Sequence, residues 1–209
     1  MKVITVPYGK ENMSAYVPED VEIQYIDFKG TESSLDEEIM LKDAMDHPIG
    51  SPRLEKLVSS KDKVLIVVND HTRPGPNKLI VQEILKRLKN SGLDKKQIKF
   101  IIATGSHRTT TINELINILG QDIVDNFEII IHDCKDEENL IYLGESIYNV
   151  PIYVNKALGE CTFCIVTGLI APHHSAGFSG GRKSIVPGLV GLKTLKIHHS
   201  LPIRPYEPA

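Results

Sequence analysis

The middle of the chain alternates between strand-like and helix-like stretches, and this alternation limits the folds it can adopt. Residues 63–69 (KVLIVVN) form a continuous β-branched run, typical of a strand covered on both faces. An apolar stripe at helical spacing follows, made of Ile80, Val81, Ile84, Leu85 and Leu88. Further strands are expected over 98–104, 127–132 and 163–170. Strands that alternate with helices form right-handed βαβ units. We therefore expect an α/β fold with a Rossmann-like, mostly parallel sheet flanked by helices.

The first 60 residues and the connecting segments carry weaker signals. Short β segments are expected over 2–6, 15–17, 21–26, 140–143 and 152–154. Ser34 and Glu37 form a capping-box pattern ahead of a helix that continues to Met45. A short helix is expected from Ser51 to Val58, and Thr111 with Glu114 caps a helix that Gly120 ends. No repeat, low-complexity tract or obvious linker is present.

Composition excludes several classes of protein. The 209 residues are 41% hydrophobic and 24% charged, as in ordinary soluble domains. The formal charge of −3 argues against a broad nucleic-acid surface. The sequence has no apolar run of membrane-spanning length and no signal-peptide pattern, so a cytoplasmic location is expected. Cys161 and Cys164 form C-x-x-C on an expected strand, where residues three apart point to opposite faces, which disfavours a metal or redox role.

Polar segments follow each of the stronger strands. They are Asp70–Pro74 (DHTRP), Thr104–Arg108 (TGSHR), His132-Asp133 and Pro172–His174 (PHH). Ligands of parallel α/β sheets bind beyond the carboxyl ends of the strands. We therefore expect imidazole, guanidinium and carboxylate groups to line one edge of the sheet and to form a site there.

Each of these segments has a functional and a structural interpretation. Arg73 could hold a carboxylate or phosphate and Asp70 a ligand hydroxyl, or Asp70 could cap the next helix and pair with Arg73. His107 could act as an acid or base beside an anion held by the turn and Arg108, or it could be a hydrogen-bonded turn residue beside a solvent-facing arginine. For His132-Asp133 a structural pair is the preferred interpretation.

The segment Ala171–Gly188, APHHSAGFSGGRKSIVPG, combines histidines, glycines and two cations. Glycines allow the backbone to approach a ligand closely, and Arg182 and Lys183 suit an anion. A Walker A loop needs glycine directly before its lysine, and Arg182 occupies that place, so nucleoside-triphosphate hydrolysis is set aside. The structural alternative is a tight turn between a strand and a helix.

The His198-His199 pair closes a short helical stretch that begins near Gly191. Leu192, Leu195 and His199 share one helical face, so His199 is expected to point inward with the leucines. An inward histidine is usually a hydrogen-bonded core residue. Spacing alone therefore predicts no metal site.

Together, the motifs DHTRP, ATGSHR and PHHSAGFSGGRKSIVPG and the histidine pair at 198–199 resemble the lactate racemase family, which uses a nickel-pincer nucleotide. The resemblance implies an isomerase, a racemase or epimerase of lactate or a related 2-hydroxy acid. It also implies hydride abstraction to the nucleotide, with paired histidines as acid and base. The cofactor would be pyridinium-3-thioamide-5-thiocarboxylic acid mononucleotide carrying nickel.

The resemblance also implies a role for particular residues. Lys183 would carry the cofactor covalently, and His199 would bind nickel. His107 and His173 would be the catalytic acid–base pair, although His174 leaves open which of the two adjacent imidazoles acts. The remaining cofactor-binding residues would be Asp70, Arg73, Gly180, Gly181 and Arg182.

The same resemblance gives expectations about the whole protein. Residues 1–209 would be the N-terminal cofactor-binding and catalytic domain of a longer protein, without its C-terminal lid domain, and inactive or nearly so alone. The expected partners are a small 2-hydroxy acid and cofactor-maturation enzymes, with no nucleic acid and no membrane. Two alternatives remain open at this point: a non-catalytic phosphate- or nucleotide-binding α/β domain, and a metal-dependent hydrolase that uses the histidines.

Overall fold

The computed structural model describes residues 1–25, 36–173 and 176–200. The chain divides into two compact units, Met1–Leu35 and Asp36–Ala209. The first unit contains an antiparallel hairpin of β1 (Lys2–Tyr8) and β2 (Glu11–Val17), which includes the short β segments predicted over 2–6 and 15–17. Residues 21–25 form no strand, so the β segment predicted over 21–26 is wrong for its described part.

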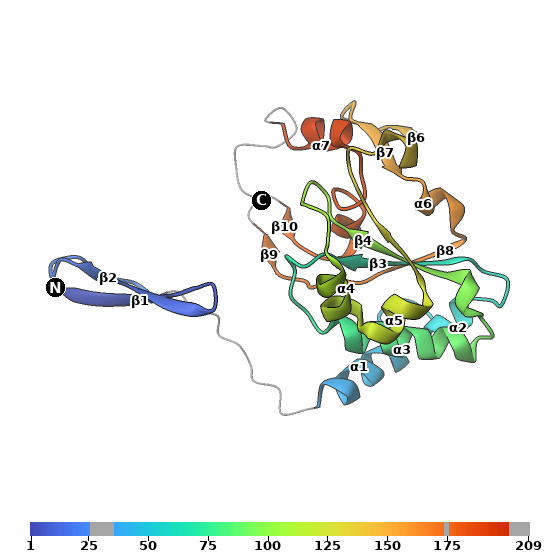
Figure 1. Cartoon of the computed structure of the whole chain (residues 1–209), viewed down its shortest axis with the longest axis horizontal. Helices are drawn as coiled ribbons and strands as arrows, with labels where there is room; N and C mark the ends of the chain where they lie inside the picture. Colours follow the sequence, from blue (N-terminus) through green and yellow to red (C-terminus); the bar gives the residue numbers. More distant parts are fainter. Residues whose placement is uncertain (26–35, 174–175, 201–209) are drawn as a thin grey trace. The chain divides into compact units, whose positions relative to one another are not determined.

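The second unit is built on a four-stranded parallel sheet with the order β5-β4-β3-β8 (Figure 1). The strands are β3 (Val64–Asn69), β4 (Ile98–Ala103), β5 (Glu128–Ile131) and β8 (Phe163–Val166). The predicted parallel α/β sheet is therefore confirmed. β8 stops at Val166, four residues before the predicted end. Thr167 still donates its backbone N–H and its hydroxyl to the Val67 carbonyl, and Gly168 then lies against Gly180 and Ser184 of the glycine-rich segment.

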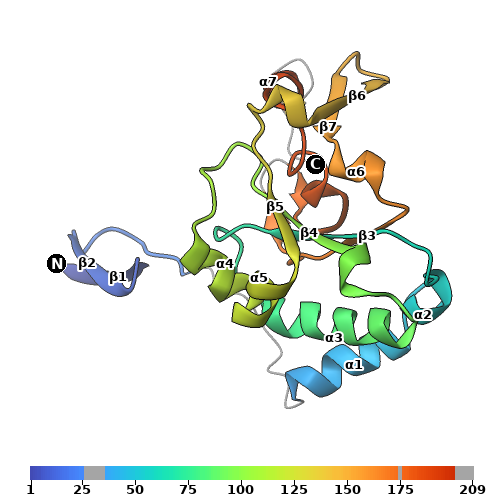
Figure 2. The ribbon, with the colours of Figure 1, turned by 45° about the vertical axis from the view of Figure 1, so that its right-hand side comes forward.

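Helices cover one face of this sheet and shorter elements cover the other (Figures 1 and 2). On the first face, Ile66 and Phe100 pack in a cluster with the helices α3 (Asn77–Asn90), α4 (Ile112–Leu119) and α5 (Gln121–Asn126). On the second face, Leu65 and Ile101 pack with Leu189 and α6 (Ala157–Glu160). Successive residues of a strand point to opposite faces, so the continuous β-branched run supplies both clusters.

Helix ends agree with the predicted capping chemistry in one of two cases. Thr111 and Glu114 form the predicted capping box of α4, and Gly120, with φ +93°, ends that helix. Helix α1 (Glu37–Asp46) is capped instead by Asp36, whose carboxylate accepts the backbone N–H groups of Glu38 and Ile39. The capping box predicted at Ser34 and Glu37 is therefore wrong for Glu37, and Ser34 lies outside the described residues. The short helix predicted over 51–58 is α2 (Leu54–Leu57).

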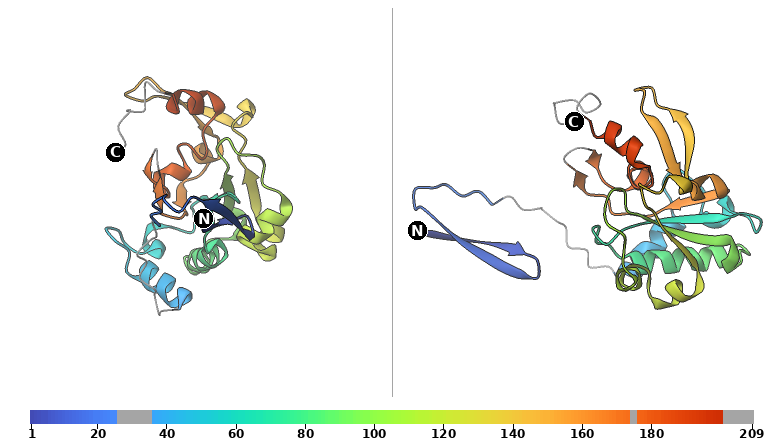
Figure 3. Two further views of the ribbon diagram at one scale, coloured as in Figure 1. Left: turned by 90° about the vertical axis from the view of Figure 1, so that its left-hand side faces the viewer. Right: turned by 45° about the horizontal axis from the view of Figure 1, so that its top comes forward.

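A second, smaller layer lies beside the main sheet. Strands β6 (Leu140–Glu145) and β7 (Pro151–Asn155) form an antiparallel hairpin, and α7 (Leu192–His198) packs beside β7 (Figure 3). The remaining elements are η1 (Lys95–Gln97), η2 (Glu137–Asn139), β9 (Pro172–His173), β10 (Gly177–Phe178) and η3 (Gly181–Ser184). None of the helices in the described residues is both long and apolar enough to cross a membrane.

The two cysteines of the C-x-x-C pattern are packing residues. Cys161 ends α6 and is not part of β8, so the argument that the two side chains point to opposite faces is wrong. Both pack against the same cluster as Leu65 and Ile101. Burial raises the pKa of the Cys164 thiol to about 11, and it raises the pKa of Cys161 as well. Because the thiolate is the nucleophile and the metal ligand, both thiols are poorly suited to either role.

A buried arginine joins the helices on the first face. The side chain of Arg87, in α3, is 5% exposed and pairs with Asp46, Glu55 and Glu83 at 2.9, 3.1 and 2.8 Å. The hydrogen bond from Arg87 is the main cause that holds the pKa of Asp46 below its usual range. A carboxylate with a depressed pKa stabilises the folded state above its unfolded pKa, and this contribution is lost as pH falls through its folded pKa.

We expect Arg87→Leu to lower the free energy of unfolding at pH 7 by about 3 kcal/mol, because it leaves three neighbouring carboxylates without their cation. The loss is expected to shrink at pH 4, where protonation relieves their repulsion. Urea unfolding at both pH values measures it, with Lys89→Leu, at an exposed position of the same helix, as the control. An equal loss at the two pH values would contradict the electrostatic explanation.

Candidate active site

The topology places the candidate site beyond the carboxyl end of β3. From β3 the chain crosses to β4 and β5 on one side, and it later returns to β8 on the other side. Such a reversal of strand order opens a crevice at the strand ends, where α/β proteins bind ligands. A hydrogen bond of 3.0 Å from the Ser184 hydroxyl to the Asn69 side-chain carbonyl ties the glycine-rich segment to the end of β3.

Asp70 and His107 form a close pair at this edge. Asp70 is 1% exposed, and its Oδ2 lies 2.6 Å from Nδ1 of His107, whose side chain is 43% exposed. The other carboxylate oxygen accepts the hydroxyl of Thr72 at 2.7 Å and the Thr72 backbone N–H at 3.2 Å. A carboxylate cannot donate, so Nδ1 carries the proton and Nε2 is left as the basic nitrogen.

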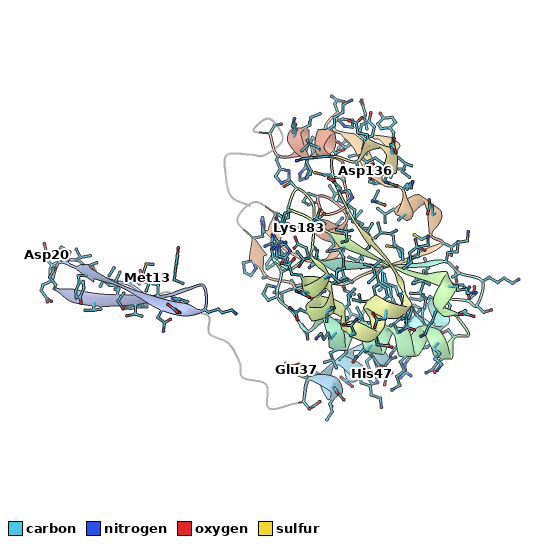
Figure 4. All side chains as sticks on the ribbon, viewed as in Figure 1. Met13, Asp20, Glu37, His47, Asp136 and Lys183 are labelled. Carbon is cyan, nitrogen blue, oxygen red and sulfur yellow. The ribbon has the colours of Figure 1, made fainter. Side chains whose placement is uncertain are left out.

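Lys183 lies in η3, in the part of the glycine-rich segment that follows β10 (Figure 4). Its Nζ is buried, and no hydrogen-bond partner reaches it among the described residues. Desolvation, followed by the charge of Arg73, lowers the pKa of the Lys183 amine. A buried amine with a lowered pKa has a larger uncharged fraction, and the uncharged form is the nucleophile.

Glycines bring several backbones together around Lys183. A Cβ on Gly188 would lie 2.2 Å from the Ser184 carbonyl oxygen, and one on Gly168 would lie 3.4 Å from Cα of Gly180. Gly180 and Gly181 have φ values of +77° and +50°, in the region that side chains disfavour. The backbone path on both sides of Lys183 therefore requires glycine.

The other predicted site residues lie in β9, in η3 and at the end of α7. His173 lies in β9 and pairs with Gly177. Arg182 is exposed in η3. His199 follows the last residue of α7, is exposed, and its Nδ1 lies 3.1 Å from the Leu195 carbonyl oxygen. The prediction that His199 points inward is wrong, because His199 is the exposed C-cap of α7 and its ring lies against the Leu195 carbonyl at the end of the helix.

Comparison with known proteins agrees with this arrangement. The profile of the lactate racemase N-terminal domain matches residues 8–207. The chain belongs to the lactate racemase N-terminal domain family. It is 36% identical over 202 residues to a lactate racemase of Lactiplantibacillus plantarum, and 36% identical over 206 residues to one of Thermoanaerobacterium thermosaccharolyticum. These alignments cover 96% and 95% of this chain and 47% of each relative, so the chain spans about half the length of the curated lactate racemases.

Solved structures give the same result. The lactate racemase apoprotein of T. thermosaccharolyticum matches 91% of this chain and 44% of its own, with a TM-score of 0.76 at 36% identity. A Thermotoga maritima protein matches 75% of this chain and 39% of its own, with a TM-score of 0.59 at 27% identity. The fold of the lactate racemase N-terminal domain is thus shared over nearly the whole chain.

Two other polar segments at strand ends are structural in this lactate racemase family domain. Arg108 pairs through both terminal nitrogens with Glu114, the capping-box glutamate of α4, so the structure gives Arg108 a carboxylate partner within the chain in place of the hypothesised bound anion. His132 is 2% exposed and contacts the Val190 carbonyl and Asn155. The preferred structural interpretation of His132 is confirmed, with partners other than Asp133.

Sequence reasoning missed several residues of the site. Thr72 follows Asp70 by two positions, the spacing at which an aspartate accepts from its own turn, so the signal was present. His71 lies 3.9 Å from Glu114, and its Nδ1 is buried without a hydrogen-bond partner among the described residues. Asn69 and Ser184 are 115 positions apart, and no local pattern indicates their contact.

Proposed function

We propose that this chain holds the cofactor and the acid–base groups of a racemase or epimerase of lactate or a related 2-hydroxy acid. One observation carries the proposal: the buried amine of Lys183, which has no hydrogen-bond partner among the described residues, and the Asp70–His107 pair lie on segments that meet at one end of the sheet. Membership of the lactate racemase N-terminal domain family supports the same assignment.

The residues present fit the nickel-pincer nucleotide that the family resemblance implies. In the part of the chain that the structure describes, the buried amine of Lys183 has no hydrogen-bond partner, which leaves it available as the nucleophile for a covalent bond. The glycine backbone at 180–181, with Arg73 and Arg182, would hold the nucleotide phosphate, and His199 would be the protein's ligand to nickel. When bound, the cofactor supplies an acceptor for the C2 hydrogen and its electron pair.

The chain's own residues would move the proton. The C2 hydrogen of a 2-hydroxy acid is poorly acidic, which makes its removal as a proton difficult. Its removal as hydride instead requires that the hydroxyl proton leave at the same time. Nε2 of His107 accepts that proton while Asp70 holds the ring and stabilises the imidazolium. His173 serves the opposite face and donates a proton to the carbonyl oxygen of the transient keto acid as hydride returns to C2, which gives the other enantiomer.

The two alternative functions receive less support. A phosphate- or nucleotide-binding domain without chemistry is not favoured by the family match, and one of its expected anion contacts, Arg108, is held by Glu114. A hydrolase with a metal bound only by side chains needs several ligands close together. Residues 1–25, 36–173 and 176–200 contain no group of three or more histidine, cysteine or acidic side chains that could hold a metal ion.

We propose that racemase turnover needs further protein segments and a loading step in addition to these 209 residues. The curated relatives are about twice as long, and we propose that the part of those proteins outside the match contributes substrate contacts. We also propose that maturation enzymes load the cofactor, and that the chain alone has little or no racemase activity.

The test is to produce the chain with the maturation enzymes and nickel and to measure intact and peptide masses. We expect a covalent adduct on the peptide that contains Lys183, with bound nickel. Full-length, loaded protein is then expected to exchange the C2 hydrogen of lactate or a larger 2-hydroxy acid. Persistent absence of the adduct with nickel supplied would favour the binding domain over the racemase.

A further inference from the structure

The segment 188–192 connects the two residues proposed to hold the cofactor, Lys183 before it and His199 after it. Its backbone is tied to three different strands or strand ends. Gly105, after β4, donates its N–H to the Gly188 carbonyl at 2.9 Å. Asn155 of β7 donates to the Leu189 carbonyl at 2.8 Å, and Leu192 donates to the Cys134 carbonyl, after β5, at 2.7 Å. This segment therefore sets the spacing between the proposed covalent attachment and the proposed metal ligand.

The buried imidazole of His132 also hydrogen bonds to the segment 188–192. His132 immediately follows β5, and its Nε2 lies 3.1 Å from the Val190 carbonyl oxygen. A carbonyl only accepts, so Nε2 carries the proton and Nδ1 accepts from the Asn155 side-chain amide at 3.3 Å. The Asn155 side-chain carbonyl in turn accepts the Ala157 backbone N–H at 3.0 Å, which fixes the orientation of that amide.

The backbone of His132 is fixed as well. Its N–H donates to the Ile102 carbonyl at 3.2 Å, and its carbonyl accepts the Thr104 hydroxyl. His132, Asn155 and Thr104 are 2%, 4% and 2% exposed, and Val190 is 0% exposed. A set of buried polar groups that satisfy one another permits one arrangement, because each alternative leaves a buried donor or acceptor unpaired.

We propose that His132 and Asn155 are positioning residues that fix the backbone at 188–192, so that Lys183 and His199 can hold one cofactor together. Neither side chain touches the cofactor in this proposal. His132 acts through the Val190 carbonyl, and the Asn155 side chain acts by holding the His132 ring. The inference rests on the proposed function for the identity of the group held. The hydrogen bonds by which His132 and Asn155 hold the backbone at 188–192 can be tested without that group.

The first experiment measures amide hydrogen exchange in the unloaded chain. His132→Leu removes both side-chain hydrogen bonds, whereas His132→Gln keeps an N–H donor within reach of the Val190 carbonyl. We expect His132→Leu to speed exchange at the amides of Gly105, Gly191 and Leu192 by about tenfold or more relative to α3, through local opening. His132→Gln is expected to stay close to the wild type. Unchanged exchange in His132→Leu would overturn the proposal.

The second experiment measures adduct on Lys183 and nickel per chain after maturation. His132→Leu is expected to lower both several-fold, and His132→Gln to restore them. Leu119→Ala, in the cluster on the other face of the sheet, is a control that loses stability through a cavity. If Leu119→Ala lowers the loading as much as His132→Leu does, the effect is general instability and the positioning role is refuted.

Two further points keep the tests separate. If His132→Leu does not fold, Thr104→Val, which removes only the hydroxyl donor to the His132 carbonyl, must give the same local exchange signature or the proposal fails. If the wild-type chain itself takes up no adduct, the proposed function fails. The exchange measurements still decide whether His132 fixes the backbone at 188–192.

Discussion

Replacing Lys183 by arginine is expected to abolish the covalent adduct and to lower racemase activity of the full-length matured enzyme by at least about 10⁴-fold, the scale of losing a covalent catalytic group. Arginine keeps the positive charge and much of the length of lysine. Its guanidinium stays protonated, however, and cannot act as a nucleophile. The amine of Lys183 differs in this respect because its burial and the nearby Arg73 favour the uncharged form.

The measurement is intact mass after maturation with nickel, together with C2 hydrogen exchange by the full-length protein. Lys78→Arg is the matched control, because Lys78 is exposed in the first turn of α3. It should leave the adduct and the rate unchanged. An adduct of the same mass in Lys183→Arg would show that another residue carries the cofactor, and full activity without any adduct would rule out the proposed chemistry.

The fold was largely predictable because its signals are local. The β-branched run at 64–69 indicates a strand, and the apolar residues of α3 recur at helical spacing. Strands that alternate with helices in this way indicate a parallel sheet. Boundaries were less predictable where tertiary contacts decide them. β8 ends at Val166 although the apolar sequence continues, and the residue after Thr167, Gly168, lies against Gly180 and Ser184 of the glycine-rich segment.

The position of the candidate site at the strand ends was predictable, but the contacts between its side chains were not. The rule that ligands bind at strand carboxyl ends located Asp70, His107 and the glycine-rich segment. The rule does not say which side chains pair. Asp70 was expected to contact a ligand or Arg73, whereas the structure pairs it with His107, 37 positions away. Arg108 was expected to face an anion, yet Glu114, six residues on, neutralises it.

Asp70→Asn is expected to lower kcat by about 10³–10⁴-fold, the scale of losing a correctly oriented general base. An asparagine can turn its amide N–H₂ toward Nδ1 of His107. Nδ1 then becomes the acceptor, and the ring proton moves to Nε2. The nitrogen that should take the substrate's hydroxyl proton is then already protonated, although side-chain size and the Thr72 contact are nearly preserved.

The readouts must separate this tautomer change from poor cofactor loading. The rate is therefore expressed per chain that carries adduct and nickel, so that any loss of loading from the predicted contact of Asp70 with the cofactor is counted separately. Thr72→Val, which leaves the carboxylate in place, is expected to cost about tenfold or less. The ratio of kcat/KM in the two directions equals the equilibrium constant, which a substitution cannot change. The value of kcat/KM must therefore fall by the same factor in both directions, and comparing the two directions cannot identify the affected histidine. Nitrogen NMR of the His107 imidazole can identify it. A wild-type ring already protonated on Nε2 and bare on Nδ1 would refute the role given to Asp70.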